Sequence, residues 1–183
     1  MRFSPKTILL KDGRKCTLRP AVPDDAVQLI EYLKLTAAET PYLLKYPDEW
    51  TLTEEKEREL LDGILDTEYC TMAVAETDGI IAGNSSINPV GGARRVRHRC
   101  SLAIALKKDY WSLGIGSALI QLQTELARQI GYEQMDLEYA DGNDRARALY
   151  ERCGFAETGR RHSSLKYDDG TYRDEILMYK SLK

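Results

Sequence analysis

The fold is decided by residues 101–131, SLAIALKKDYWSLGIGSALIQLQTELARQIG. An apolar, β-rich run ends at Leu106, and a short polar loop separates it from Gly114-Ile115-Gly116. Behind these glycines, apolar residues recur every three or four positions, as they do on one face of a helix. They are Ile115, Leu119, Leu122, Leu126 and Ile130, before Gly131 ends the pattern. The stretch therefore predicts a strand, a glycine-containing loop and a long amphipathic helix, in that order.

The start of this helix is a candidate anion site. The first turn of a helix leaves backbone N–H groups without partners, and the helix dipole adds to their attraction for a phosphate. Gly114 and Gly116 have no Cβ, which lets an anion approach the main chain, and Lys107 and Lys108 add positive charge nearby. Two glycines at a helix start also fit a tight turn without a ligand. A dinucleotide-binding fingerprint fits less well, because Leu119 stands where it has a third glycine.

The rest of the chain predicts helices and strands in mixed order. Before the glycine loop, the expected elements are a strand at 16–19, a helix from about 24, an irregular loop at 36–50, a helix from 51 to about 63, and strands at 69–76, 80–88 and 96–106. After it come a strand at 134–139, a helix at 143–154 and strands at 156–166 and 171–181. Thr51 and Glu54 form a capping-box pattern, and Thr77-Asp78-Gly79 is typical of a hairpin turn. These signals predict an α/β domain.

Size and charge narrow the functional classes. The chain has 183 residues, of which 43% are hydrophobic and 30% charged, and this balance predicts one globular domain over residues 1–183. The formal net charge of -3 argues against nucleic-acid binding, which needs a surplus of Lys and Arg. No apolar run approaches the ~20 residues that span a bilayer, and the start lacks an apolar signal core. We therefore expect a cytoplasmic protein with neither nucleic-acid nor membrane partners.

Cysteine and histidine usage predicts no metal site. The four cysteines have no CxxC spacing and lie beside apolar residues in predicted strands or helices, so we interpret them as reduced core residues. They are Cys16, Cys70, Cys100 and Cys153. His98 and His162 are the two histidines, which is too few for a histidine-rich centre.

A second motif follows the glycine loop, at residues 143–155, NDRARALYERCGF. It matches the pattern Asn-x-x-Ala-x-x-Leu-Tyr-x-x-x-Gly-Phe at every fixed position. Together with the strand and glycine loop before it, the motif resembles the GNAT superfamily of acyl-CoA dependent N-acetyltransferases, and the element order agrees from Thr17 to Ser181. The resemblance implies a mixed α/β fold with a mostly antiparallel, twisted sheet of about seven strands. About four helices flank this sheet, which is splayed at the cofactor site.

The resemblance also implies which residues hold acetyl-CoA. Main-chain groups at the strand end pair with the pantetheine arm as an added strand would, and backbone donors around the glycines hold the pyrophosphate. The residues concerned are Ile104, Ala105, Leu106, Leu113, Gly114, Ile115, Gly116, Ser117, Asn143 and Tyr150. Trp111 departs from the pattern, since the family usually has Arg or Gln there. Tyr150 would stand beside the thioester sulfur as general acid, because an unperturbed pKa of about 10 keeps it protonated at neutral pH.

The remaining roles are the base and the acceptor site. Glu138, at the end of a buried strand, is the first choice of base, with His98 or a chain of waters as alternatives. The irregular loop 36–50 falls where the family builds its acceptor pocket, and Glu39, Tyr42 and Tyr46 offer charge and aromatic faces to a cationic amine. The expected reaction is direct transfer of the acetyl group, in a ternary complex, to a small amine or a protein N-terminus.

Other interpretations of these residues stay open. Tyr150 also fits a core aromatic, Asn143 a helix N-cap and Glu138 a strand-edge charge. A chain that kept the cofactor site but lost the acceptor chemistry would be a non-catalytic acyl-CoA binding or sensing module. Members of the superfamily are often dimers, and the terminal strands here suggest a possible homodimer.

Overall fold

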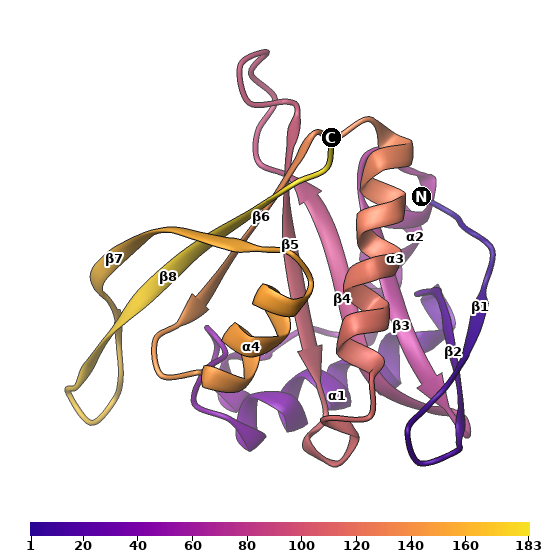
Figure 1. Ribbon diagram of the computed structural model, residues 1–183. Helices are drawn as coiled ribbons and strands as arrows, with labels where there is room; N and C mark the ends of the chain where they lie inside the picture. Colours follow the sequence, from indigo (N-terminus) through magenta and orange to yellow (C-terminus); the bar gives the residue numbers. More distant parts are fainter.

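The computed structural model describes residues 1–183 as one eight-stranded sheet with four α-helices (Figure 1). The strand order is β1-β2-β3-β4-β5-β6-β8-β7, and only β5 and β6 pair in parallel. The strands are β1 Lys6–Leu9, β2 Lys15–Pro20, β3 Thr71–Thr77, β4 Ile80–Pro89, β5 Arg99–Leu106, β6 Gln134–Ala140, β7 Ala156–Lys166 and β8 Tyr172–Ser181. The helices are α1 Ala26–Glu39, α2 Glu54–Asp66, α3 Ile115–Ile130 and α4 Asp144–Arg152. No helix has both the length and the apolar character needed to cross a membrane.

The mixed α/β fold with a mostly antiparallel sheet is confirmed, with one strand more than the sequence predicts. The additional strand is β1, which has four residues, and only Ile8 among them is partly covered. Such a strand has no alternation of apolar and polar residues, which is the pattern that identifies strands in a sequence.

The first helix is longer than predicted. α1 continues through Thr36 to Glu39, where the sequence predicts a loop, and the Thr36 hydroxyl donates to the Tyr32 carbonyl (2.9 Å). This bond satisfies the buried hydroxyl inside the helix. The helix ends at Glu39, because Thr40 precedes Pro41 and a residue before proline disfavours helical geometry.

Two further boundaries are corrected. Thr53 and not Thr51 caps α2, since the Thr53 hydroxyl accepts the Lys56 N–H, and the helix runs beyond Gly63 to Asp66. β5 begins at residue 99 and not at 96, because the N–H groups of residues 96 and 97 both bond to the carbonyl of residue 93 in a tight turn (2.9 and 3.0 Å). The predicted strand position of residue 98 is therefore wrong.

The sheet is splayed between β5 and β6. Their parallel register covers only Arg99–Ser101 opposite Gln134–Asp136, and from there β6 follows β8 alone as far as Ala140. A gap therefore opens between the C-terminal halves of β5 and β6 (Figure 1). Ala103 is exposed and Ile104 is half-buried, although this half of the strand is apolar in sequence.

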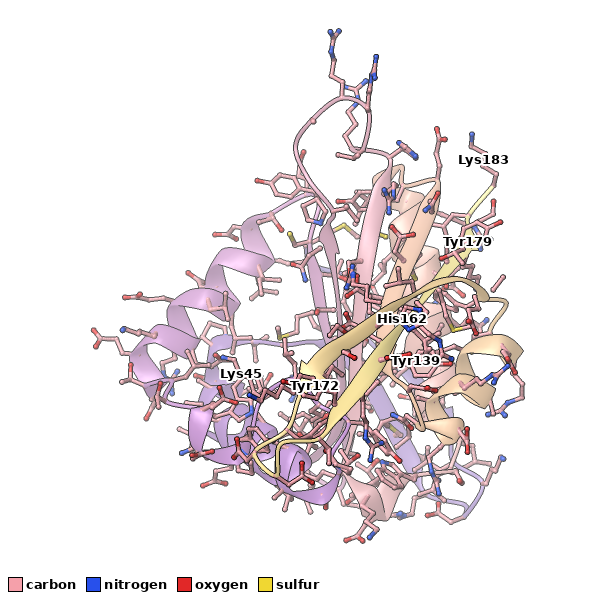
Figure 2. The ribbon with its side chains drawn as sticks, turned by 90° about the vertical axis from the view of Figure 1, so that its left-hand side faces the viewer. Lys45, Tyr139, His162, Tyr172, Tyr179 and Lys183 are labelled. Atoms are coloured by element: carbon pink, nitrogen blue, oxygen red, sulfur yellow. The ribbon has the colours of Figure 1, made fainter.

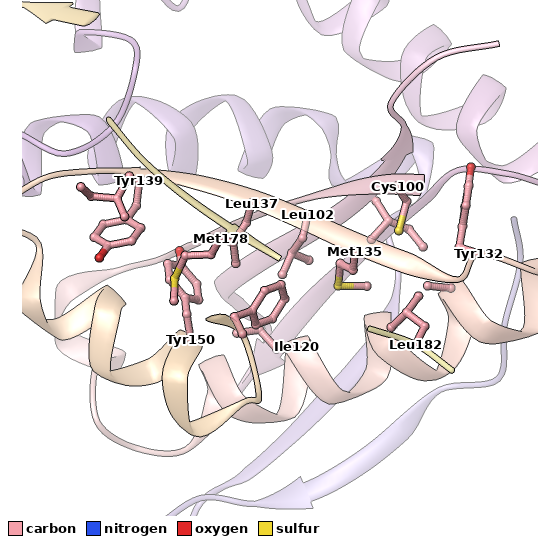
Figure 3. Packing of buried hydrophobic residues seen from close by; sticks show 14 residues of the cluster. Cys100, Leu102, Ile120, Tyr132, Met135, Leu137, Tyr139, Tyr150, Met178 and Leu182 are labelled. Carbon is pink, nitrogen blue, oxygen red and sulfur yellow. The ribbon is translucent and has the colours of Figure 1, made fainter. Parts of the chain in front are cut away.

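Helices cover both faces of the sheet (Figure 1). α3 packs on one face through Leu119 and Leu122, and α1 packs on the other through Leu29 and Tyr32. The short helix α4 lies on the α3 side, where its Tyr150 joins the buried cluster drawn in Figure 3. This packing places α4 beside the gap between β5 and β6.

Candidate functional site

A cavity of about 830 Å³ lies where the end of β5, the start of α3, the start of α4 and the α1–α2 loop meet. Its volume falls in the range of ~300–1,000 Å³ that is typical of small-molecule sites. The predicted residues that line it are Tyr42, Ile104, Ala105, Leu106, Gly114, Gly116, Ser117, Asn143 and Tyr150. The predicted residues that do not line it are Glu39, Tyr46, Leu113, Ile115 and Glu138.

Some main-chain N–H and C=O groups of β5 face the gap instead of β4. The Lys107 N–H donates to the Ala82 carbonyl (2.9 Å), and the ladder to β4 has a regular register back to residue 100. Because pairing alternates along an antiparallel ladder, the odd-numbered residues of β5 bond to β4, and Ile104 and Leu106 direct their N–H and C=O groups toward β6. The Trp111 indole N–H donates to the Leu106 carbonyl (2.9 Å), which leaves the Leu106 N–H and both groups of Ile104 facing the gap.

β6 supplies the other side of the gap. The Asp141 N–H donates to the Asp174 carbonyl (2.9 Å), and the register with β8 is regular, so the odd-numbered residues of β6 bond to β8. Glu138 and Ala140 therefore direct their main-chain groups toward β5. An extended ligand between the two strands meets donors and acceptors on both sides, as an added strand would.

The N-terminus of α3 lies at the same gap, and the N–H groups of its first turn are unpaired. The Ala118 N–H bonds to the Gly114 carbonyl (3.1 Å), so the N–H groups of residues 115–117 have no partner within the helix. No side chain caps this end of α3, and its first turn contains no acidic residue. The start of α3 therefore has the free donors that the predicted anion site requires.

The two glycines of this turn serve different purposes. Gly114 has a φ of 101°, which residues with a Cβ rarely adopt, and an added Cβ would meet nothing within 4 Å. At Gly116, an added Cβ would lie 2.9 Å from Leu149 Cδ2 and 3.3 Å from Leu106 Cδ1. The sequence argument that both glycines open the main chain to an anion is therefore corrected for Gly116, which allows α3 to pack closely on α4 and β5.

Positive charge lines the cavity. The charged lining residues are Lys11, Arg145, Arg152 and Asp144. Lys107 and Lys108, which the sequence argument places near the phosphate, are not among them, and the Lys107 ammonium lies 5.8 Å from the Tyr32 ring centroid instead. The excess of cations over carboxylates suits a ligand with several negative charges.

Tyr150 belongs to both the cavity and the core. Its ring packs against Tyr139 and Phe155, with centroid distances of 5.8 and 6.1 Å, and Figure 3 shows Tyr150 and Tyr139 in the same cluster. Burial, with a smaller contribution from Tyr139, raises the pKa of Tyr150 to about 12, so its hydroxyl is protonated at neutral pH. Asn143 is the N-cap of α4, because its Oδ1 accepts the Ala146 N–H (3.2 Å), and it also lines the cavity.

The Glu138 side chain lies outside the cavity. Leu137 and Tyr139 on either side of it face α3 and α4, so the Glu138 side chain points to the opposite face of the sheet, where α1 lies. Arg161 of β7 binds its two carboxylate oxygens (2.6 and 2.7 Å) and also binds Glu175 (2.6 Å). This pairing lowers the pKa of Glu138, which makes the carboxylate a weaker base.

The predicted acceptor residues fasten the α1–α2 loop to its surroundings. The Glu39 carboxylate accepts the Lys108 N–H at the end of β5 (2.7 Å). The Tyr42 hydroxyl donates to the Gly142 carbonyl before α4 (2.9 Å), and the Tyr46 hydroxyl accepts a backbone N–H of the β7–β8 turn (3.0 Å). Of the three, Tyr42 lines the cavity.

The β7–β8 hairpin reaches over to this loop, on the side of the molecule drawn in Figure 2, which labels Tyr172 of the hairpin and Lys45 of the loop. The Tyr167 hydroxyl donates to a loop carbonyl (3.0 Å). The Arg173 guanidinium lies 5.1 Å from the Tyr42 ring centroid and 5.4 Å from that of Tyr167. The aromatic face of Tyr42 that the sequence offers to a cationic amine is thus already in contact with a cation of the chain.

His98 is remote from the cavity, and several cavity residues were not found from the sequence. His98 does not line the cavity, and Arg99, the residue after it, lies roughly 17 Å from Ile104 along β5 at ~3.3 Å per strand residue. The missed residues include the cations Lys11, Arg145 and Arg152 of the lining and Arg173 above Tyr42. Arg145 had one signal, its place in the first turn of a helix that begins with a motif residue.

Sequence comparisons identify relatives for most of the chain. The profile described as "Acetyltransferase (GNAT) family" matches residues 33–155. A curated protein from Xenopus tropicalis, "Probable N-acetyltransferase camello", is 37% identical over 87 residues, which are 46% of this chain and 38% of that protein. The match therefore spans less than half the length of that relative.

Solved structures share the whole fold. An acetyltransferase of the GNAT family from Streptococcus pneumoniae is 29% identical with a TM-score of 0.86, and 91% of this chain and 99% of that chain are covered. A putative acetyltransferase from Salmonella typhimurium, solved with its cofactor acetyl-CoA, is 17% identical with a TM-score of 0.81 and coverage of 92% and 94%. With the family match over residues 33–155, these likenesses lead to one conclusion. This chain belongs to the GNAT family of acetyltransferases.

Proposed function

We propose that the protein is an N-acetyltransferase that passes the acetyl group of acetyl-CoA directly to a primary amine. One observation carries the proposal: main-chain groups of Ile104, Leu106, Glu138 and Ala140 face a gap that leads to the uncapped start of α3. Such a gap suits an extended chain of amides that ends in phosphates. Family membership and the fold neighbour solved with acetyl-CoA support the same ligand.

The residues present fit acetyl-CoA. The gap offers N–H and C=O groups to the amides of the pantetheine arm, and the N–H groups of residues 115–117 face its pyrophosphate. The cationic lining residues Lys11, Arg145 and Arg152 balance the phosphate charge. When bound, acetyl-CoA supplies an acetyl thioester that is activated toward attack by an amine. The role of the protein is to hold this group, exclude competing nucleophiles and stabilise the charges that develop.

Tyr150 is the proposed acid. Its pKa of about 12 keeps the phenol protonated at neutral pH, so a donor is always present where sulfur leaves. Because an ordinary thiol has a pKa of about 8.5, below that of the phenol, the hydroxyl stabilises the departing thiolate mainly by hydrogen-bond donation. A proton that passes to sulfur is restored to the tyrosine by the one that the amine loses as the C–N bond forms. The Leu106 N–H, which faces the gap, is the proposed donor to the oxygen that becomes negative.

Direct transfer is proposed because the cavity lining contains no cysteine. Cys153, close in sequence to Tyr150, lies outside the lining, and burial raises the pKa of its thiol. Its thiolate is therefore scarce at neutral pH, and a thiolate is the nucleophile that a covalent acyl-enzyme needs. The amine attacks in a ternary complex instead.

The acceptor is proposed to enter from the side of the α1–α2 loop, where Tyr42 lines the cavity and Glu39 and Tyr46 hold the loop in place. Its class is a small amine or a protein N-terminus.

A homodimer and a cytoplasmic location stay predictions. β7 forms one edge of the sheet and can pair across subunits, because an edge strand has a row of open main-chain groups.

The first prediction concerns binding and turnover. Acetyl-CoA at about 100 times its Kd should stabilise the fold by about 2.7 kcal/mol, which corresponds to a Tm increase of roughly 5–10 °C for a chain of this size. A panel of primary amines should then release free thiol, measured with a thiol-reactive dye. Binding without release from any amine or peptide N-terminus would indicate the non-catalytic sensing module instead. An unchanged Tm would contradict acetyl-CoA binding itself.

The second prediction tests Glu138 as the base, acting through water because its carboxylate lies outside the cavity. Glu138→Gln should lower kcat/KM at pH 7 by about tenfold or more and should approach wild type at high pH, where the amine is already neutral. Glu175→Gln is the matched control, since Glu175 binds the same Arg161 (2.6 Å). Equal losses in both variants would assign the two carboxylates to fixing Arg161 and would remove Glu138 from the proton path.

A further inference from the structure

The last four residues of the loop that leads into α3 contain no cation. They are Trp-Ser-Leu-Gly, residues 111–114, and the first turn of α3 adds none. Because the pyrophosphate of acetyl-CoA carries negative charge, the N–H groups of residues 115–117 alone leave this charge without a counter-ion. The cation whose side chain contacts residues 111 and 112 is Arg145, from the first turn of α4.

Arg145 is held at the loop by two contacts. Its guanidinium lies 4.5 Å from the Trp111 ring centroid, and its Nη1 donates to the Ser112 hydroxyl (2.9 Å). Trp111 is itself fixed, because its indole N–H donates to the Leu106 carbonyl at the end of β5 (2.9 Å). A chain of contacts thus runs from the strand through the loop to the guanidinium.

The held guanidinium has donors to spare and no anionic partner. Arg145 lines the cavity and forms no ion pair with any carboxylate of the chain. One of its five N–H groups is used by Ser112, and the others stay free in a planar fork that suits a phosphate. By contrast Arg147, two residues along the same helix, points away from the cavity and pairs with Glu151 (2.9 Å).

We propose that Arg145 binds the pyrophosphate of acetyl-CoA and that Trp111 is the positioning residue that holds its guanidinium at the start of α3. This inference rests on the proposed function. It explains why an aromatic residue can stand at position 111. An arginine there would supply the cation directly, whereas the Trp111 indole holds the cation that Arg145 of α4 supplies.

The test compares binding of three ligands by calorimetry. Arg145→Ala should raise the Kd of acetyl-CoA about 20-fold, because a charge-assisted hydrogen bond to phosphate is lost. The same factor is expected for the analogue without the 3′-phosphate, and no change is expected for S-acetylpantetheine, which has no phosphate. Arg147→Ala, the matched control, removes the same charge from α4 and should change each Kd less than twofold.

Trp111→Leu tests the positioning role. It should raise the Kd of acetyl-CoA about fivefold in the wild-type background and have no further effect in the R145A background, because the two residues act through one contact. Additive effects would overturn the role of Trp111. An R145A loss that is absent without the 3′-phosphate, that persists with S-acetylpantetheine, or that R147A reproduces would overturn the pyrophosphate assignment. Failure of the wild-type protein to bind acetyl-CoA would instead refute the proposed function.

Discussion

Tyr150→Phe should lower kcat by about 100-fold or more, while the Kd of acetyl-CoA changes less than threefold. The variant removes only the hydroxyl, and general-acid catalysis typically contributes ~10²–10⁴ in rate. The ring contacts with Tyr139 and Phe155 need no hydroxyl, so the fold and the cofactor site stay intact. Stopped-flow thiol release at saturating acetyl-CoA and acceptor measures kcat directly.

The pH profile of the wild-type enzyme checks the same role. The hydroxyl loses its proton only near pH 12, so the acid form is complete at neutral pH and is lost as pH rises through that value. We expect kcat/KM to rise with pH as the amine becomes neutral and then to stay level up to about pH 10. A descending limb below pH 10 would mean that the acid is another group.

Tyr139→Phe is the matched control for Tyr150. Tyr139 packs against Tyr150 in the same cluster and is equally buried, but it does not line the cavity. Its hydroxyl should therefore be dispensable for turnover. An undiminished rate in Y150F, or the same loss in Y139F, would contradict the acid role and favour a purely structural tyrosine.

Local sequence patterns predicted most of the fold because its central elements are long and periodic. α3 has an unbroken apolar stripe that ends at Gly131, and the structure places its bounds where the pattern does. The short β1 and the last turn of α1 were missed because their stability comes from tertiary contacts: β1 pairs with β2, and the Glu39 carboxylate accepts the Lys108 N–H (2.7 Å). Patterns of apolar residues do not record such contacts.

The candidate site was predictable only where it consists of main chain or of motif residues. The main-chain site at Ile104 and Leu106 could be predicted, because the sequence contains a strand followed directly by a glycine loop. The contacts of individual side chains could not be predicted, because their partners come from distant segments of the chain. Arg161, for example, is 23 residues from Glu138 in the chain. Its salt bridge with Glu138, the predicted base, lowers the pKa of the Glu138 carboxyl group.

Substitution of Gly114, the glycine that precedes α3, should have the second large effect, on the affinity for acetyl-CoA. Gly114 and Gly131 stand at opposite ends of this helix with almost the same backbone, φ values of 101° and 100°, and an added Cβ meets nothing at either position. Gly114→Ala and Gly131→Ala should therefore each reduce the free energy of unfolding by roughly 1–2 kcal/mol, measured by urea denaturation, because both force an alanine into left-handed geometry.

Binding should separate the two variants. Gly114 lines the cavity and precedes the free N–H groups, so an alanine there adds a methyl group at the anion site and tilts the donors. We expect Gly114→Ala to raise the Kd of acetyl-CoA at least about tenfold, and Gly131→Ala to leave it within twofold of wild type. Equal Kd values in the two variants would show that strain in α3, and not access to its first turn, governs the affinity. The uncapped helix start would then lose its role as the phosphate site.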